Sequence, residues 1–319
     1  MRVIKPKSEV GKLLIESNVS ETESMWSSTT SYALGALVCF IRYEIVSGIN
    51  GSITTDVMET NGIYKSAVSG NLNNQPDIST DKWIWVSPAN KYAMFDSQIS
   101  TQTTSTSDII VDISTGTSDS LAVFNVEGES VSLVINDAAS TVNPVYSSTQ
   151  SLQGSAVLDW YQYFYFDETD IRTQAVFLNI PISSSTAIST LTIAKGSGTY
   201  TAVGNVSFGT LSTIGRTNYG MSAGITDYST KETDEYGSTV FTIRDYSKKI
   251  TAEVQIDNFD LNRVQRTLYS LRATPAVWVS TMDARYEESS VVFGFYRDFS
   301  ISITYPTHSR CSLEIEGLI

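Results

Sequence analysis

Carboxylate and aromatic side chains gather between residues 159 and 170, where they could hydrolyse a glycosidic bond. Asp159 and Asp167 could supply the two carboxylates that a glycosidase places across the scissile bond, and the neighbouring Trp160 could line the cleft. The segment 167–170 (DETD) has, however, the composition of an exposed hairpin tip. A turn is therefore the favoured interpretation, and a depolymerising enzyme is the third hypothesis.

The sequence contains few other residues or motifs that could carry out catalysis. His308 is the only histidine, it stands near Pro306, and neither a Gly-x-Ser-x-Gly nor a His-Glu-x-x-His motif accompanies it. The segment 196–198 (GSG) lacks the Gly-Lys-Ser/Thr and the following helix of a phosphate loop, and the sequence has no Asp-rich calcium loop. The sequence predicts a protein that is not an enzyme and has no cofactor and no metal site.

Four aromatic residues near the N-terminus could instead bind sugar, because the C–H face of a sugar ring stacks on a flat π-system. The alternative is that they fill the core of a small β domain, which needs large side chains, and this is the favoured interpretation. The candidates are Trp26, Tyr64, Trp83 and Trp85.

The spacing of these aromatics resembles that of the small chitin- and cellulose-binding modules of carbohydrate-binding families 5 and 12. The resemblance rests on Trp26, residues 32–38 (YALGALV), residues 64–67 (YKSA), residues 71–76 (NLNNQP) and the closing Trp83 and Trp85. It implies a glycan-stacking surface made by the four aromatics. Ala36 replaces an acidic residue that the family often shows, and residues 39–61 form a long insertion.

A mainly β fold must position these residues, since Ser, Thr, Tyr, Val and Ile are frequent and only 17% of residues are charged. We expect an N-terminal small aromatic β module, a central β-sandwich and a C-terminal β domain with one packed α-helix. The expected boundaries are an arm over 1–24, the module over 25–96, the sandwich over 97–203 and the C-terminal domain over 204–319.

Periodicity supports this division. Alternating segments separated by Ser/Thr/Gly/Asp clusters predict the strands of the sandwich at 109–113, 120–126, 130–136, 160–166, 175–180 and 187–194. Leucine and valine at spacings of three and four predict one helix over about 258–273, and Pro275 follows its end. A hairpin is expected around 234–237 (DEYG).

The segment 286–319 alternates aromatic and aliphatic residues up to the last residue. Such a strand is expected to pair within a sheet, either in its own domain or in a neighbouring subunit. We therefore predict that the end of the chain takes part in assembly. The assembly residues expected are Leu313, Ile315, Leu318 and Ile319.

Charge and cysteine content limit the partners. A formal net charge of -13 disfavours nucleic acid, which is bound by clustered Lys and Arg. The longest apolar run, 33–41, is too short to span a membrane. Cys39 and Cys311 lie in apolar surroundings and are expected to be buried thiols. Synthesis in a cytoplasm, with no secretion signal, fits these features.

Several stretches together resemble a family of bacteriophage and prophage tail proteins. They are 1–6 (MRVIKP), 89–96 (ANKYAMFD), 227–237 (DYSTKETDEYG), 272–278 (RATPAVW), 294–301 (GFYRDFSI) and 311–318 (CSLEIEGL). The resemblance implies a structural subunit of the virion tail or baseplate, made in the host cytoplasm, whose partners are further copies of itself and other tail proteins. The alternative function is adsorption to a glycan of the host surface through the aromatic module.

Overall fold

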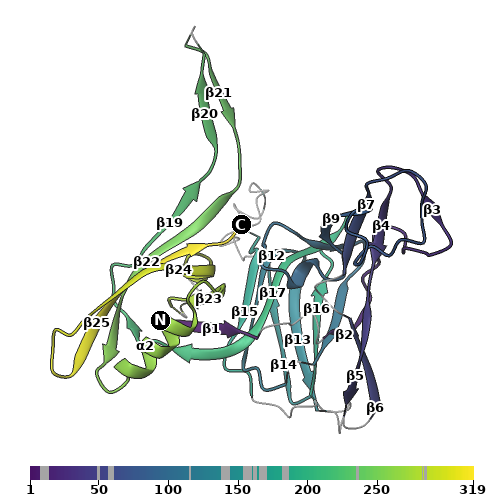
Figure 1. The fold of residues 1–319 in the computed structure, drawn as a ribbon. Coiled ribbons are helices and arrows are strands. Elements are labelled where there is room, and N and C mark those ends of the chain that lie inside the picture. Colours follow the sequence, from purple (N-terminus) through teal and green to yellow (C-terminus); the bar gives the residue numbers. More distant parts are fainter. Residues whose placement is uncertain are drawn as a thin grey trace. The chain divides into compact units, whose positions relative to one another are not determined.

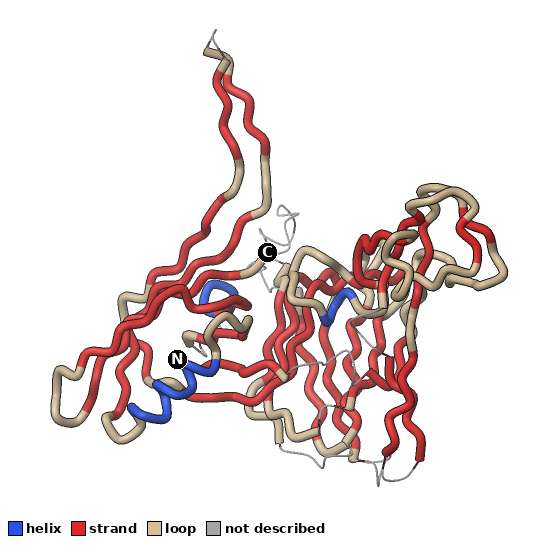
Figure 2. Tube along the Cα trace, viewed as in Figure 1, coloured by secondary structure: helices blue, strands red, loops and turns tan. Residues whose placement is uncertain are grey.

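The computed structural model describes residues 1–7, 14–48, 51–56, 61–114, 116–137, 144–153, 160, 164, 171–181, 187–234, 237–281, 283 and 286–319. Strands dominate it and form several antiparallel sheets, so the mainly β prediction is confirmed (Figure 2). The chain divides into two compact units. Unit 1 contains Met1–Pro6 and Gly209–Ile319, and unit 2 contains Lys7–Phe208.

Unit 2 contains two groups of strands that share one apolar core. Alternate residues of the first group, such as Val131, Leu133 and Ile135, point into this core, as the period of a half-buried strand requires. The first group has the order β14 (Tyr146–Ser151), β13 (Ser130–Asn136), β16 (Ile188–Ala194), β11 (Ile109–Ile113) and β2 (Leu14–Ser17). The second comprises β15 (Gln174–Phe177), β12 (Ser120–Glu127), β10 (Thr103–Ser105) and the first part of β17 (Thr201–Thr213).

The aromatic segment of unit 2 forms small sheets of its own. A three-stranded sheet has the order β4 (Leu37–Phe40), β7 (Gly62–Ser66) and β9 (Trp83–Pro88). Beside it are the pairs β3 (Ser31–Tyr32) with β8 (Asn71–Leu72) and β5 (Tyr43–Gly48) with β6 (Gly51–Asp56). A short 3-10 helix, Ala93–Phe95, follows β9, and its three residues are buried.

Unit 1 is a sheet covered by one helix. The strand order is the last part of β17, then β1 (Arg2–Pro6), β23 (Ala276–Val279), β24 (Val291–Ser302), β25 (His308–Gly317), β22 (Tyr246–Asp257) and β18 (Arg216–Thr217). Helix α2 (Leu261–Ser270) packs Val264 and Leu268 into the sheet's core, as the spacing predicted, but is shorter than the expected 258–273. A second helix, α3 (Glu287–Ser290), has a single turn.

Residues 1–24 were expected to form an N-terminal arm, but two of their segments are strands that pair within sheets. Val3 and Ile4 are fully buried because β1 is paired with β17 on one side and β23 on the other. Residues Leu14–Ser17 form β2 and pair with β11. The expected boundary at 203/204 also falls inside β17, which runs unbroken from Thr201 to Thr213. These pairings join residues that are distant in sequence, so no local pattern indicates them.

A long β hairpin extends from the sheet of unit 1 (Figure 1). Strand β19 (Ser222–Asp227) pairs with the first half of β22, and the chain continues into β20 (Thr230–Thr233) and β21 (Thr239–Thr242). Gly237 adopts a positive φ of 82° near the tip, within the turn that the sequence predicted. We call residues 228–245 the arm.

Candidate functional site

The structure does not bring the four predicted sugar-stacking residues to one surface. Tyr64 and Trp83 are buried, and Trp83 is only 3% exposed. The Trp83 ring packs edge-on against Tyr32 at 5.4 Å, and its Nε1 donates a hydrogen bond to Asn74 O at 2.8 Å. Both residues belong to the core of the aromatic module, together with Val38 and Phe40.

Trp26 and Trp85 are more accessible. Trp26 is partly buried and packs edge-on against Phe40 at 5.8 Å. Trp85 is 53% exposed, and its indole lies over Gly62, where a Cβ atom would come within 2.6 Å of Nε1. Gly62 therefore makes room for the ring. One exposed indole is available for stacking on a ligand.

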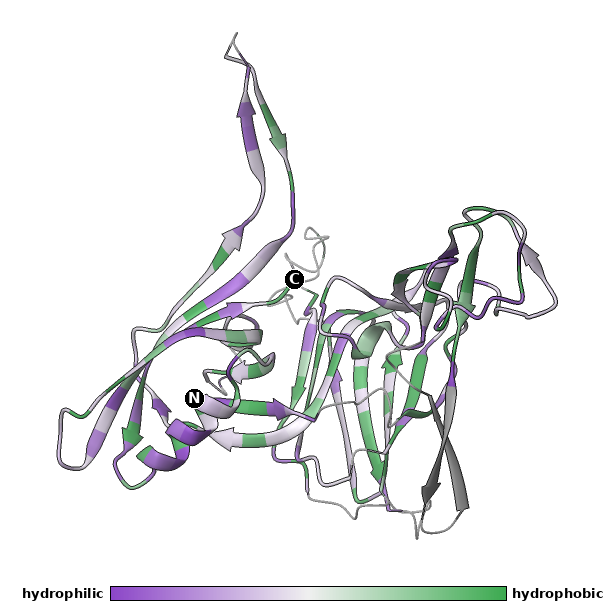
Figure 3. Cartoon of the chain, in the orientation of Figure 1, coloured by the Kyte–Doolittle hydropathy of each residue, from purple (hydrophilic) through white to green (hydrophobic). Residues whose placement is uncertain are grey.

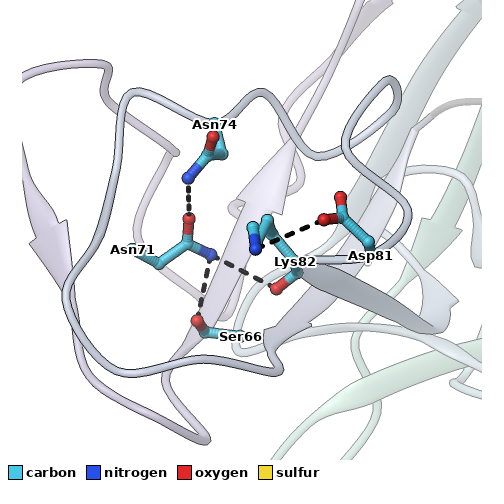
Figure 4. A network of polar contacts seen from close by, with 5 residues as sticks. All are labelled: Ser66, Asn71, Asn74, Asp81 and Lys82. Carbon is cyan, nitrogen blue, oxygen red and sulfur yellow. Dashed lines mark hydrogen bonds and ion pairs between the residues drawn. The ribbon is translucent and has the colours of Figure 1, made fainter.

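A polar network closes the loop between β8 and β9 (Figure 4). Asn71 Nδ2 donates to Ser66 Oγ at 3.0 Å and to Lys82 O at 3.3 Å, and Asn74 Nδ2 donates to Asn71 Oδ1 at 2.7 Å. Asn71 is itself buried, so these bonds satisfy a side chain that would otherwise be costly to desolvate. The network fixes the loop that carries the hydrogen-bond acceptor of Trp83.

A buried carboxylate lies on the same loop. The Asp77 side chain is 2% exposed and forms an ion pair with Arg42 Nη1 at 3.4 Å. Its Oδ1 has no hydrogen-bond partner among the described residues. Burial, and secondarily the nearby Asp77 charge, raises the pKa of the Tyr64 hydroxyl. The arrangement ties the loop to the segment after β4.

The carboxylates considered for glycoside hydrolysis, Asp159 and Asp167, lie outside the described residues. Trp160 and Phe164 are exposed and stack on each other at 6.3 Å. His308 stacks on Tyr305 at 4.5 Å, and its Nδ1 lies 3.1 Å from Thr307 Oγ1.

Two of the four predicted assembly residues, Leu313 and Ile315, belong to a strand that is paired inside this chain, and Leu318 and Ile319 follow its end. β25 lies between β22 and β24 and pairs with both. Leu313 and Ile315 are fully buried in the core of unit 1, whereas Leu318 and Ile319 are partly buried. A neighbouring subunit therefore cannot add a strand along 308–317. Assembly through these four residues stays a prediction.

The arm exposes apolar side chains that have no core to join. Phe241 is 67% exposed and Ile243 is 88% exposed, and Val240 is also exposed. Phe241 lies opposite Lys231 in the pairing of β20 with β21, and the Lys231 ammonium lies 5.8 Å from the ring centroid. Figure 3 shows hydrophobic colouring on β21. Ile243 directly follows the last residue of β21, so two large exposed apolar side chains, Phe241 and Ile243, lie near the end of this strand.

The turn residues of this hairpin are evident in the sequence, whereas the exposure of its apolar residues is not. The signal was the alternation over 239–243 (TVFTI) directly after a charged turn. A paired hairpin with few contacts to other strands cannot bury either of its faces within the chain. An isolated two-stranded hairpin is at best marginally stable in water, which makes this surface a candidate for contact with a partner.

Both cysteines are free and buried, which confirms the expectation of two buried thiols. Burial raises the pKa of Cys39 to about 12 and that of Cys311 to about 11, so neither thiol is reactive near neutral pH.

In the described part of the chain, no helix is long and apolar enough to cross a membrane. The described residues also contain no group of three or more His, Cys, Asp or Glu side chains that could hold a metal ion.

Comparison with known proteins does not supply a family. The sequence matches no protein-family model and no curated protein.

Proposed function

We propose that this chain is a non-enzymatic structural subunit of a bacteriophage tail or baseplate that assembles in several copies. The observation that carries the proposal is the arm, which places Phe241 and Ile243 in solvent in the single chain. Burial of such side chains contributes about 1.5–3 kcal/mol each, so a neighbouring copy that covers them gains substantial binding energy.

The sequence resemblance to phage tail proteins supports this role and supplies its context. The finer organisation proposed is an aromatic β module, a β-sandwich and a C-terminal β domain with one packed helix. The partners are other copies of this chain and other tail or baseplate proteins. The proposed location is the virion tail, after synthesis in the host cytoplasm, without contact with nucleic acid or insertion into a membrane.

Quantitative mass spectrometry of purified phage particles tests this role. Isotope-labelled peptides from this chain, added as standards, should give a fixed ratio of several copies per particle. A tail protein of known copy number from the same particle serves as the internal control. Absence of the chain from particles whose other tail proteins are present would refute the proposal.

A second candidate function is glycan binding by the aromatic module, favoured by one observation, the exposed indole of Trp85. In this proposal, Trp85 supplies the stacking face for a sugar of the host surface. Tyr64 and Trp83 support the module from its core and do not touch the ligand.

The two tryptophans of β9 give a matched test of glycan binding. Trp85→Ala should abolish retention on chitin, cellulose or host polysaccharide and lower the unfolding midpoint less than Trp83→Ala does, because about half of the Trp85 side chain is exposed. Trp83→Ala should instead destabilise the module by about 3–5 kcal/mol, because it removes a buried ring. Pull-down and denaturant unfolding measure the two effects. Retention that is unaffected by Trp85→Ala would contradict glycan binding at this site.

A further inference from the structure

The exposed indole of Trp85 lies near a group of polar residues that the core of the aromatic module does not use. The indole packs over Gly62, where a Cβ atom would come within 2.6 Å of its Nε1. Asn61 precedes Gly62 in the chain, and its Oδ1 accepts the backbone N–H of Arg42 at 2.7 Å. Arg42 follows the end of β4, and Gly62 begins β7, which pairs with β4. The stacking ring and Arg42 therefore lie toward the same end of this sheet.

Arg42 presents hydrogen-bond donors to solvent. Its side chain is 50% exposed, and a single contact holds it, from Nη1 to Asp77 Oδ2 at 3.4 Å. The Arg42 guanidinium makes no other hydrogen bond to a residue that the structure describes. A guanidinium carries several N–H donors, so most of those on Arg42 remain available to a ligand.

Two buried polar atoms beside Arg42 also lack partners. Asn61 is 2% exposed, and its Nδ2 donates no hydrogen bond within the described part of the chain. The Asp77 side chain is 2% exposed, and its Oδ1 accepts none there. Buried polar atoms without partners are costly, and a ligand that supplies the partners recovers this free energy. The group therefore lacks both an acceptor for Asn61 and a donor for Asp77.

This combination favours a neutral ligand that carries hydroxyl groups. The charges of Arg42 and Asp77 cancel, so a charged group on the ligand is attracted by one of them and repelled by the other. A hydroxyl can accept from Asn61 or Arg42 and donate to Asp77, whereas a carboxylate only accepts and an ammonium only donates. A ring with several hydroxyls and a C–H face that stacks on an indole is a neutral saccharide.

We propose that Arg42 binds hydroxyl groups of a neutral saccharide stacked on Trp85, and that Asn61 and Asp77 complete the polar side of this site. The proposal rests on glycan binding, the second candidate function, and deepens it by naming the ligand class and a specificity-determining residue. A hydroxyl reaches Asp77 Oδ1 as the Arg42 guanidinium shifts, which its single contact of 3.4 Å allows. Arg42 and Asn61 belong to the insertion 39–61, so the resemblance to carbohydrate-binding modules does not supply them.

Isothermal titration of the full chain with two neutral oligosaccharides, cellohexaose and chitohexaose, tests this assignment. Arg42→Gln together with Asp77→Asn removes both charges, leaves no lone buried charge, and should weaken binding at least about tenfold. Arg42→Lys keeps a positive charge beside Asp77 but loses the planar fork of donors, and it should also weaken binding. Trp85→Ala should abolish binding.

Lys65→Gln is the matched control for the loss of a basic side chain. Lys65 is exposed on the same sheet, but it pairs with Ile84 while its neighbour Tyr64 pairs with Trp85, so it lies on the opposite face. This variant should bind both oligosaccharides as wild type does. Thermal unfolding checks that every variant is folded.

Charged counterparts of the two probes test the ligand class. The glucosamine hexamer has free amines where chitohexaose has acetamides, and the β-1,4-linked glucuronic acid hexamer has carboxylates where cellohexaose has hydroxymethyl groups. Each should bind at least about tenfold more weakly than its neutral counterpart, because one member of the Arg42–Asp77 pair repels it.

Three outcomes would overturn the proposal. If the wild-type chain binds none of the four oligosaccharides, the assignment fails, and glycan binding fails with it unless host polysaccharide is retained through Trp85. If Trp85→Ala abolishes binding but both Arg42 variants bind as wild type does, the indole binds glycan and the polar side of the site is refuted. If a charged hexamer binds more tightly than its neutral counterpart, the neutral ligand class is refuted while glycan binding stands.

Discussion

Replacing Phe241 and Ile243 together with serine should weaken self-association of the chain about a hundredfold or more. Both side chains are largely exposed in the single chain, and they lie two residues apart on the arm. Each loses about 1.5–3 kcal/mol of apolar burial when serine replaces it, and every 1.4 kcal/mol corresponds to a tenfold change in the dissociation constant. Sedimentation velocity over a range of concentrations measures the effect.

Two control variants test whether weaker association comes from the loss of Phe241 and Ile243 in particular or from the loss of any exposed apolar side chain. Ile78→Ser removes another exposed apolar residue, in the aromatic module, and should leave the association unchanged. Thr242→Ser changes the opposite face of β21 and should have little effect. The free energy of unfolding should stay within about 0.5 kcal/mol of wild type in all three cases, because the substituted side chains are exposed. Association of the double variant at wild-type strength would show that the arm is not an interface.

Asn90→Ala should destabilise unit 2 by about 3 kcal/mol. The Asn90 side chain donates to Ser20 O at 2.8 Å and to Thr104 O at 2.9 Å, and its Oδ1 accepts the backbone N–H of Thr104 at 2.9 Å. Alanine removes all three of these part-buried hydrogen bonds, each of which contributes about 1 kcal/mol. Denaturant unfolding followed by tryptophan fluorescence measures the loss.

The neighbouring Glu21 explains why this position is sensitive. Its carboxylate accepts the backbone N–H of Asn90 at 2.8 Å and that of Lys91 at 3.3 Å. The junction between the aromatic module and the strands that follow it is therefore a connected polar network. Asn218→Ala is the matched control, because that side chain makes one exposed hydrogen bond of 3.3 Å to Glu253 and should cost less than 1 kcal/mol. Equal losses for the two variants would refute a special role for Asn90.

The sequence predicted those strands and the helix that have a hydrophobic pattern within their own residues. The alternation over 109–113 and 130–136 coincides with β11 and β13, and the leucine and valine spacing located α2. The strand after Tyr286 was expected to need a partner, but its sequence could not indicate which one. In the structure, β25 pairs with β22 and β24 of the same chain.

The candidate sites were harder to predict because exposure depends on tertiary position. Trp83 and Trp85 lie two residues apart on β9, so they share a face, yet one is buried and the other is half exposed. Strand β9 is at the edge of its sheet and its pairing with β7 is irregular next to Tyr64, which places Trp85 at the rim of the core. Arg2 and Arg216 line one cavity of unit 1 although they are distant in sequence, and no local pattern could indicate this.

An electron-microscopy map of the intact particle tests the central claim, assembly in several copies through the arm, most directly. Repeated copies of this chain should surround the tail axis, and Phe241 and Ile243 of each arm should contact protein density from a neighbouring copy. A map in which the chain is present but every arm is surrounded by solvent would contradict the account.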